Sequence, residues 1–255
     1  MTRAAVVIPA RYASQRLPGK PILERVRQAT GKYLIQHVYE QVQRAENVDT
    51  VIVATDDRRI FDAVSKFGGE ARMTSTEHRS GTDRVAEVAE ILDHGIIVNV
   101  QGDEPEILAE QVDQVVALLA ADETASMATL ACPIHDVAHW RDPNAVKAVV
   151  DSAGNALYFS RSPIPYMRDI DGLPDAPPAR PLHHLGIYAY RRDFLLTYAD
   201  LPASSLEQAE KLEQLRALDA GHRIKVGVTQ HMPCGIDTPE DLEAWLASRA
   251  DSDTA

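Results

Sequence analysis

The sequence predicts an α/β fold whose mostly parallel sheet is covered by helices on both faces. Short runs rich in Val, Ile and Ala recur at residues 4–10, 50–54, 96–100 and 127–133. Segments with the apolar spacing of helices lie between them, at residues 34–44, 58–66, 82–92 and 110–121. Strands that are apolar on both faces and alternate with helices are typical of a parallel sheet buried between helical layers. That alternation is the doubly wound pattern.

The second half of the chain begins with a different pattern, a β-hairpin. The turn-forming segment 151–155 lies between two strand patterns at residues 145–150 and 156–161. The sequence then predicts strands at residues 185–191 and 223–229, and an amphipathic helix at residues 205–220 that ends before Gly221. A capping box at residues 238–241, with Pro239 at the first helical position, opens a last helix that ends near residue 248.

We expect one domain over residues 1–248, in which residues 135–200 form a hairpin and loop subregion. A chain of 255 residues is long enough for one large α/β domain or two small ones. The proline-rich stretch 167–181 is typical of a surface loop. Residues 249–255 are expected to fray as a tail.

Composition excludes several classes of protein. The net charge of -12 argues against nucleic acid as a partner, because that role requires a basic face. No apolar run approaches the roughly 20 residues that span a membrane, and the N-terminal run is too short for a signal peptide. The two cysteines provide neither a disulfide framework nor metal-finger spacing. These features predict a cytoplasmic protein with no membrane partner.

A basic loop follows the first predicted strand, over residues 9–21. It holds Arg11, Arg16 and Lys20 and no carboxylate, within a chain that is acidic overall. A strand that leads into such a loop suits a polyphosphate, because main-chain N–H groups and cations converge on it. The loop has neither the Walker A spacing nor the Gly-x-Gly-x-x-Gly spacing. The alternative from the residues alone is a solvated surface turn.

Two acidic segments follow predicted strands. Asp103 lies in the segment Gln-Gly-Asp-Glu-Pro at residues 101–105, and Asp237 directly precedes the last helix. Ligands of open α/β sheets bind at the carboxyl ends of the strands. If Asp103 and Asp237 meet there, they form a paired carboxylate site that suits Mg²⁺ beside phosphates. Otherwise Asp103 belongs to an ordinary turn and Asp237 interacts with a helix dipole.

Seven motifs, in order along nearly the whole chain, resemble those of the 3-deoxy-manno-octulosonate (KDO) cytidylyltransferases, the CMP-KDO synthetases. They occupy residues 9–21, 78–84, 99–105, 158–161, 184–188, 212–216 and 237–242. The resemblance implies a Rossmann-like mixed sheet of the nucleotide-diphospho-sugar transferase type, with a smaller hairpin region for sugar binding and dimerisation. It also implies a cytoplasmic homodimer that uses Mg²⁺ to couple CTP to KDO. The products would be CMP-KDO, for lipopolysaccharide assembly, and pyrophosphate.

The resemblance further implies a role for individual residues. The nucleotide would be bound by Pro9, Ala10, Arg11, Ser14, Arg16, Lys20, Thr74, Ser75, Ser80, Gly81 and Gln101. The sugar would be bound by Gln101, Arg161, His184, Tyr188, Glu213 and Gln214. The metal would be held by Asp103 and Asp237, and the catalytic set would be Lys20, Asp103, Asp237 and Arg11.

The residues alone leave simpler interpretations open for several of these positions. His184 could be a partly exposed polar residue, and Arg161 an ordinary cation at a strand end. Glu213 and Gln214 could belong to the solvated face of a helix. The run Ser80-Gly81-Thr82 could be a helix N-cap, with Thr82 well placed for that role.

Two departures from the family pattern concern the sugar more than the nucleotide. The link at residues 24–30 is longer than usual, and the proline-rich stretch 167–181 is individual to this chain. The alternatives are therefore a cytidylyltransferase for another 2-keto sugar acid, such as sialic acid or an amino variant of KDO, and a nucleotide-binding protein without catalysis. The residues indicate no general base.

Overall fold

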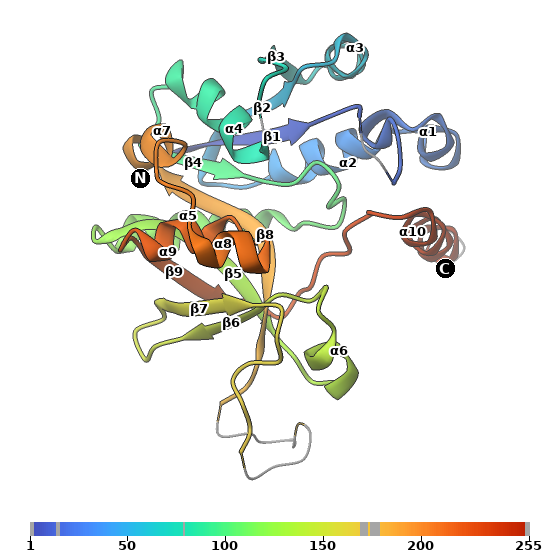
Figure 1. Ribbon diagram of the computed structural model, residues 1–255. Helices are drawn as coiled ribbons and strands as arrows, with labels where there is room; N and C mark the ends of the chain where they lie inside the picture. Colours follow the sequence, from blue (N-terminus) through green and yellow to red (C-terminus); the bar gives the residue numbers. More distant parts are fainter. Residues whose placement is uncertain (1–2, 14–15, 79, 169–172, 174–178, 253–255) are drawn as a thin grey trace. The chain divides into compact units, whose positions relative to one another are not determined.

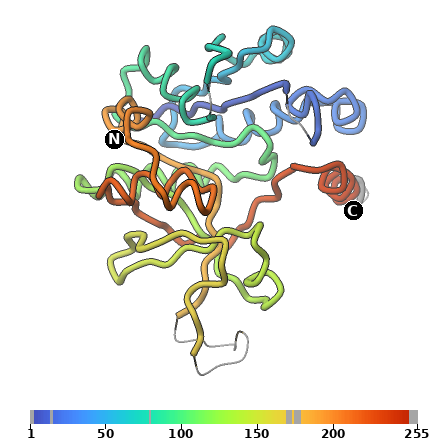
Figure 2. Tube along the Cα trace, viewed as in Figure 1, coloured from blue at the N-terminus to red at the C-terminus, as the bar shows by residue number. Residues whose placement is uncertain are grey.

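The computed structural model describes residues 3–13, 16–78, 80–168, 173 and 179–252 (Figures 1 and 2). The chain forms two compact units. The first comprises Met1–Asp113 and Pro233–Ala255, and the second comprises Gln114–Met232. Among the described residues, no helix has the length and apolar content that crossing a membrane requires.

Four parallel strands form the sheet of the first unit, in the order β3-β2-β1-β4. Their bounds are β1 Ala4–Ala10, β2 Val48–Thr55, β3 Glu70–Met73 and β4 Ile96–Asn99. The three strands that were predicted from apolar runs are confirmed, and residues 4–8 of β1 are fully buried. The sequence did not predict β3, because this short edge strand is mostly exposed and has no apolar run.

Helices of the first unit pack against these strands, and α2 and α4 both contact β1 (Figure 1). The helices are η1 Lys20–Ile22, α1 Glu24–Thr30, α2 Leu34–Val42, α3 Arg58–Lys66, α4 Gly81–Glu90, α5 Ala109–Ala121, which continues into the second unit, and α10 Pro239–Ser252. The long link at residues 24–30 is itself the helix α1. The helix α10 continues to Ser252, beyond the end predicted near residue 248.

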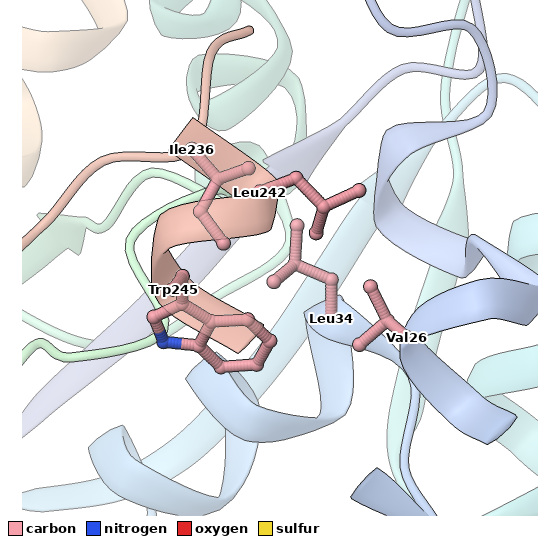
Figure 3. Close-up of a cluster of buried hydrophobic side chains, with 5 residues drawn as sticks. All are labelled: Val26, Leu34, Ile236, Leu242 and Trp245. Atoms are coloured by element: carbon pink, nitrogen blue, oxygen red, sulfur yellow. The ribbon is translucent and has the colours of Figure 1, made fainter. Parts of the chain in front are cut away.

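An apolar cluster joins α1, α2 and α10 across more than two hundred residues of sequence (Figure 3). It consists of Val26, Leu34, Ile236, Leu242 and Trp245, each at most 3% exposed. Burial of such side chains stabilises the fold by roughly 1.5–3 kcal/mol each. The cluster therefore fixes the segment before α10, which carries Asp237, beside the N-terminal helices.

The described residues of the second unit form five strands. They are β5 Ala125–Pro133, β6 Lys147–Val150, β7 Ala156–Ser160, β8 Leu182–Arg191 and β9 Arg223–Val228. Strand β5 pairs antiparallel with β8 and parallel with β9, so this region is mixed rather than parallel. The predicted hairpin of β6 and β7 is confirmed. Its turn is closed by the Asp151 carboxylate, which accepts hydrogen bonds from the N–H groups of Ala153 and Asn155.

The helices of the second unit are short: α6 Val137–Arg141, α7 Arg192–Tyr198, α8 Ser205–Glu210 and α9 Gln214–Asp219. The prediction of one helix at residues 205–220 is wrong. The chain leaves the helix at Lys211, which has a left-handed backbone with φ of 56°. Glu210 is held by hydrogen bonds to Ser160 and Arg161, and the next turn buries Leu212, so tertiary contacts override the local propensity.

Candidate active site

The basic loop turns sharply between β1 and η1. Gly19 has a left-handed backbone with φ of 69°, and its N–H donates to the carbonyl of Tyr12 at 2.9 Å. A Cβ at Gly19 would lie 3.1 Å from the Tyr12 ring, so both the conformation and the space favour glycine. The tight turn places Lys20 at the start of η1, where only 8% of the residue is exposed. Ser14, predicted to bind phosphate, lies outside the described residues.

Lys20 brings together the two carboxylates that the sequence placed far apart. Its Nζ lies 2.5 Å from Oδ2 of Asp103 and 3.1 Å from Oδ1 of Asp237. Arg16 Nη2 lies 3.3 Å from the other oxygen of Asp237. The main-chain N–H of Ile236 donates to the carbonyl of Asp103 at 2.9 Å, which ties the two acidic segments to each other. The expected meeting of the two carboxylates is therefore seen, while their role as metal ligands stays a prediction.

Glu104 adds a buried acidic side chain beside this pair. Its Oε2 is buried and has no hydrogen-bond partner among the described residues. Burial, together with the charges of Asp103 and Asp237, raises the pKa of the Glu104 carboxyl to about 8, so the group is mostly protonated near neutral pH. No role for Glu104 was predicted from the sequence, because its burial depends on how the loop packs.

The donor set fits a hard divalent cation. Within the described part of the chain, no group of three or more His, Cys, Asp or Glu side chains is arranged to hold a metal. Mg²⁺ does not require such a cage, because it is commonly held by one or two carboxylates together with water and phosphate oxygens. Asp103 and Asp237 supply two such carboxylates, and Lys20 and Arg16 are their partners in this structure.

A pocket of about 300 Å³ opens beside Lys20 and Asp103, at the lower end of the usual range for ligand sites. Its lining includes seven of the predicted site residues: Pro9, Ala10, Arg11, Lys20, Gly81, Gln101 and Asp103. A Cβ on Gly102 would lie 3.0 Å from Ile35 and 3.1 Å from the carbonyl of Pro9. Glycine at this position therefore lets the loop after β4 approach the end of β1.

The residues predicted to surround the cytosine are engaged in a hydrogen-bonded frame. Thr74 is 8% exposed, and its hydroxyl accepts a hydrogen bond from the fully buried Arg84. The same guanidinium pairs with Asp56 at 2.5 Å. The N–H of Ser75 donates to Glu87 at 2.9 Å. The sequence analysis gave no role to Arg84 or Asp56, although Arg84 closes the motif at residues 78–84.

Ser80 is the N-cap of α4, which begins at Gly81, so the expected helix N-terminus in the run 80–82 is confirmed, whereas Thr82 lies inside the helix. The Ser80 hydroxyl accepts from the N–H of Asp83 at 3.0 Å, and the Asp83 carboxylate accepts from the N–H of Ser80 at 3.1 Å. This capping box fixes the N-terminus of the helix. Because Gly81 also lines the 300 Å³ pocket, the first turn of α4 faces the place where a nucleotide is predicted.

In the second unit, His184 is a buried and neutral side chain rather than a partly exposed one. It is 7% exposed, and its Nε2 lies 3.0 Å from the hydroxyl of Thr129. Burial, together with the neighbouring His183, lowers the pKa of His184 to about 3. The ring centroids of Phe159 and Tyr188 lie 4.9 and 5.3 Å from that of His184. His184 and Tyr188 are therefore part of one aromatic row.

Arg161 is anchored by main-chain carbonyls. Its Nε donates to the carbonyl of Glu210 at 2.8 Å, and its Nη1 donates to the carbonyl of Pro143 at 3.0 Å. Gln214 is only 4% exposed, so the expectation of a solvated face is wrong for it. That expectation holds for Glu213, which is exposed and whose carbonyl accepts from the hydroxyl of Tyr198 at 2.6 Å.

The predicted residues divide cleanly between the units. Those expected to bind nucleotide and metal all lie in the first unit. Those expected to bind sugar lie in the second unit, apart from Gln101. Each of the two sets is therefore described within its own unit.

Comparison with known proteins finds similar sequences over more than nine-tenths of the chain. A family model described as "Cytidylyltransferase" matches residues 5–224. The 3-deoxy-manno-octulosonate cytidylyltransferase of Syntrophotalea carbinolica is 52% identical over 239 residues, which cover 92% of this chain and 94% of that protein. The enzyme of the same name from Geobacter sulfurreducens is 50% identical over 245 residues, which cover 94% and 96% of the two chains.

A solved structure gives the same result. CMP:2-keto-3-deoxy-manno-octonic acid synthetase, in a complex with CTP, has a TM-score of 0.90 and 46% identity over 98% of this chain and 100% of that one. A 4-diphosphocytidyl-2C-methyl-D-erythritol synthase from Anaerococcus prevotii has a TM-score of 0.62 at 15% identity, so it shares the fold alone. The chain belongs to the 3-deoxy-manno-octulosonate cytidylyltransferase family and is a nucleotidyltransferase.

Proposed function

We propose that this protein transfers the cytidylyl group of CTP to KDO, giving CMP-KDO and pyrophosphate for lipopolysaccharide assembly, at a Mg²⁺-dependent site built on the basic loop. The observation that carries the proposal is the convergence of Lys20, Asp103 and Asp237 beside a pocket lined by Arg11 and Gln101. Three segments that are distant in sequence bring cations and carboxylates to one place. That arrangement suits a triphosphate accompanied by a divalent cation.

The reaction is an in-line displacement at phosphorus. The anomeric hydroxyl oxygen of KDO forms a bond to the α-phosphorus of CTP, the bond from that phosphorus to the β-phosphate bridging oxygen breaks, and the hydroxyl proton is released. Negative charge spreads over the phosphoryl oxygens, so positioning and electrostatic stabilisation carry most of the rate enhancement. We assign no general base.

The cations of the loop act on the phosphates. Arg11 is oriented by donation from its Nη2 to the carbonyl of His78 at 3.1 Å. Lys20 has little exposure and lies at the floor of the turn, so it presents its ammonium group at a fixed place. Both residues stabilise the negative charge that accumulates on the departing pyrophosphate. Arg16, beside Asp237, adds positive charge at the edge of the loop.

Asp103 and Asp237 would hold the Mg²⁺ ion by one carboxylate each. When bound, the ion supplies Lewis-acid stabilisation of the α-phosphate. The buried Glu104 lies close to the pair, since its pKa responds to the charges of both, and it is mostly protonated near neutral pH. The charge offered to the ion is therefore that of Asp103 and Asp237.

We assign the sugar acid to groups of the second unit. Two of the three guanidinium nitrogens of Arg161 donate to main-chain carbonyls, and no hydrogen bond joins Nη2 to another described residue. Arg161 thus offers a fixed cation to the KDO carboxylate. His184 is neutral at physiological pH, so with Tyr188 and Gln214 it contributes hydrogen bonds rather than charge, while the Glu213 carboxylate accepts hydrogen bonds.

The proposal includes a homodimer and a cytoplasmic location, where CTP is available. Sedimentation of the purified protein across a range of concentrations tests the dimer. A monomer at all concentrations that support turnover would contradict it.

A pyrophosphate-release assay tests the function. The protein is incubated with CTP, Mg²⁺ and either KDO, an amino variant of KDO or N-acetylneuraminate, and parallel samples contain excess EDTA. We expect fastest release with KDO and loss of release with EDTA. Faster turnover of another sugar acid would change the substrate, and CTP binding without release against any of the three would indicate a protein without catalysis.

A further inference from the structure

A second cavity lies in the first unit, and its residues take no part in the proposed reaction. It measures about 150 Å³, half the lower limit of the usual range for organic ligands of about 300–1,000 Å³. Its walls come from α2, the loop after β4 and α10, and include Lys32, His37, Arg44, Pro105 and Arg249. The small volume and polar lining suit an ion rather than a nucleotide or a sugar.

We propose that this cavity is a binding site for inorganic phosphate in a form that still carries a hydroxyl. The inference goes beyond the proposed function and does not depend on it. It rests on an excess of cations in the lining, on a nearly buried imidazole that faces them, and on the hydrogen-bonding state of that imidazole.

The lining carries more positive than negative charge, within a protein whose net charge is -12. Among the described residues, the cavity is lined by the cations Lys32, Arg44 and Arg249 and by the carboxylate of Glu40. Lys32 Nζ lies 2.5 Å from Glu40, which balances one of the cations. The guanidinium of Arg44 contacts the neutral amide of Gln41 at 3.2 Å. A small oxyanion is therefore the complementary ligand.

The charges of two of these cations, Arg249 and Lys32, act on His37, which also lines the cavity. Arg249 lies over the Trp245 ring at 5.0 Å, and the same indole packs edge-on against His37 at 5.3 Å. His37 is 9% exposed. Burial, together with the charges of Arg249 and Lys32 and against that of Glu40, lowers the pKa of His37 to about 4. The imidazole is thus neutral, and a bound anion would restore part of its basicity.

The neutral form of His37 can be assigned from its neighbour. The Thr30 hydroxyl lies 2.9 Å from the carbonyl of Val26 and 3.0 Å from that of Lys32, and we infer that its only proton goes to one of these carbonyls. Its oxygen then accepts from Nε2–H of His37 at 2.9 Å. The other nitrogen, Nδ1, is left as an acceptor, and no hydrogen bond joins it to another described residue.

This acceptor determines which oxyanion is favoured. Phosphate near neutral pH keeps at least one P–OH group, which can donate to Nδ1 while its charged oxygens accept from Arg44 and Lys32. Sulfate has the same size and no proton to donate. The cavity should therefore bind phosphate more tightly than sulfate.

Nuclear magnetic resonance of the full chain with ¹⁵N-labelled histidine tests the proposal. Phosphate and sulfate are titrated at constant ionic strength, without CTP. We expect phosphate to shift the His37 ring signals and to raise the pKa of His37 from about 4, with weaker effects from sulfate. Equal effects of the two anions would overturn the role of the P–OH group, and no change in the His37 signals would overturn the site.

Three variants locate the anion. Arg44→Gln should weaken the phosphate response of His37 about tenfold, as expected for loss of one charge-assisted hydrogen bond. Arg58→Gln removes a similarly exposed cation from α3 and should leave the response unchanged. Arg11→Gln disables the basic loop and should also leave the His37 response unchanged. If Arg11→Gln abolishes the response while Arg44→Gln preserves it, phosphate binds at the loop and the proposal is wrong.

Discussion

In the first unit, Lys20 contacts the carboxylates of Asp103 and Asp237 at 2.5 and 3.1 Å, and all three groups carry charge. In the second unit, His184 is neutral and the Arg161 guanidinium donates to main-chain carbonyls. The side chains of Asp103 and Asp237 remain 30% and 53% exposed, whereas His184 is almost completely buried.

This difference indicates two ways of preparing a site. Partly exposed ion pairs can exchange partners at little cost, so Lys20 and the carboxylates can turn to phosphates and a cation when these arrive. Side chains held by main-chain groups keep one orientation before the ligand binds, which lowers the entropy cost of binding. We therefore expect charge-removing changes to affect turnover in the first unit and pH to affect stability in the second.

The largest effect is expected from Asp103→Asn. The side chain keeps its shape and loses the charge that holds the metal, so turnover should fall at least about 100-fold, as it does when a transition-state stabiliser is removed. Steady-state pyrophosphate release at saturating CTP and KDO measures the loss.

The matched control is Asp62→Asn on α3, whose carboxylate pairs with Arg58 at the surface. This variant should retain normal turnover. Near-normal Mg²⁺-dependent activity of Asp103→Asn would show that Asp103 is not a metal ligand. The proposed contrast between a charged site in the first unit and a neutral one in the second would then be wrong.

The second effect is on stability and concerns His184. Its pKa is about 3 in the folded chain and near 6.5 in the unfolded chain, so between these values only the unfolded chain takes up the proton. Stability from this group is complete above pH 6.5 and falls as the pH decreases. From pH 7 to pH 5 the free energy of unfolding should fall by about 2 kcal/mol on this account.

Urea unfolding at pH 7 and pH 5 measures this effect. In His184→Gln the fall should be smaller than in the natural chain by about that amount, whatever the change at pH 7. In the natural chain, the total fall in the free energy of unfolding should exceed the part that is due to His184. The reason is that burial also lowers the pKa of His183 and His37 to about 4. His135→Gln, at an exposed position of the same unit, should leave the pH dependence unchanged. If the free energy of unfolding depended on pH in the same way in His184→Gln and in the natural chain, the His184 imidazole would not be held neutral in the folded chain.

Much of the fold was predictable because the buried strands of the first unit consist mainly of apolar residues. Strand β1 is buried on both faces, and its apolar run predicts this burial. Strand β3 lacks that signal because it is a mostly exposed edge. The break between α8 and α9 was not predictable, because it depends on contacts of Glu210 with Ser160 and Arg161, which lie 50 and 49 residues away.

The candidate site was predictable to the extent that its residues follow strands. Asp103 comes four residues after β4, so its place at the sheet edge follows from topology. The burial of Glu104, Arg84 and Gln214 has no such local sign, because each is covered by segments from elsewhere in the chain. The family resemblance identified Gln214 through the motif at residues 212–216. It gave no information on the burial of the Gln214 side chain.

The smallest effect is expected from Lys20→Met, measured without nucleotide. This change leaves Asp103 and Asp237 facing each other with only Arg16 nearby, and the free energy of unfolding should fall by about 1 kcal/mol because both carboxylates remain partly solvated. Added Mg²⁺ should raise the melting temperature more in Lys20→Met than in the natural chain, since the ion no longer competes with the ammonium group. Lys66→Met, at the exposed end of α3, should gain no more from Mg²⁺ than the natural chain does. An equal rise in melting temperature with Mg²⁺ in all three proteins would mean that Lys20 and the metal do not compete for the two carboxylates. The ion pairs of the first unit would then be as fixed as the hydrogen bonds of the second.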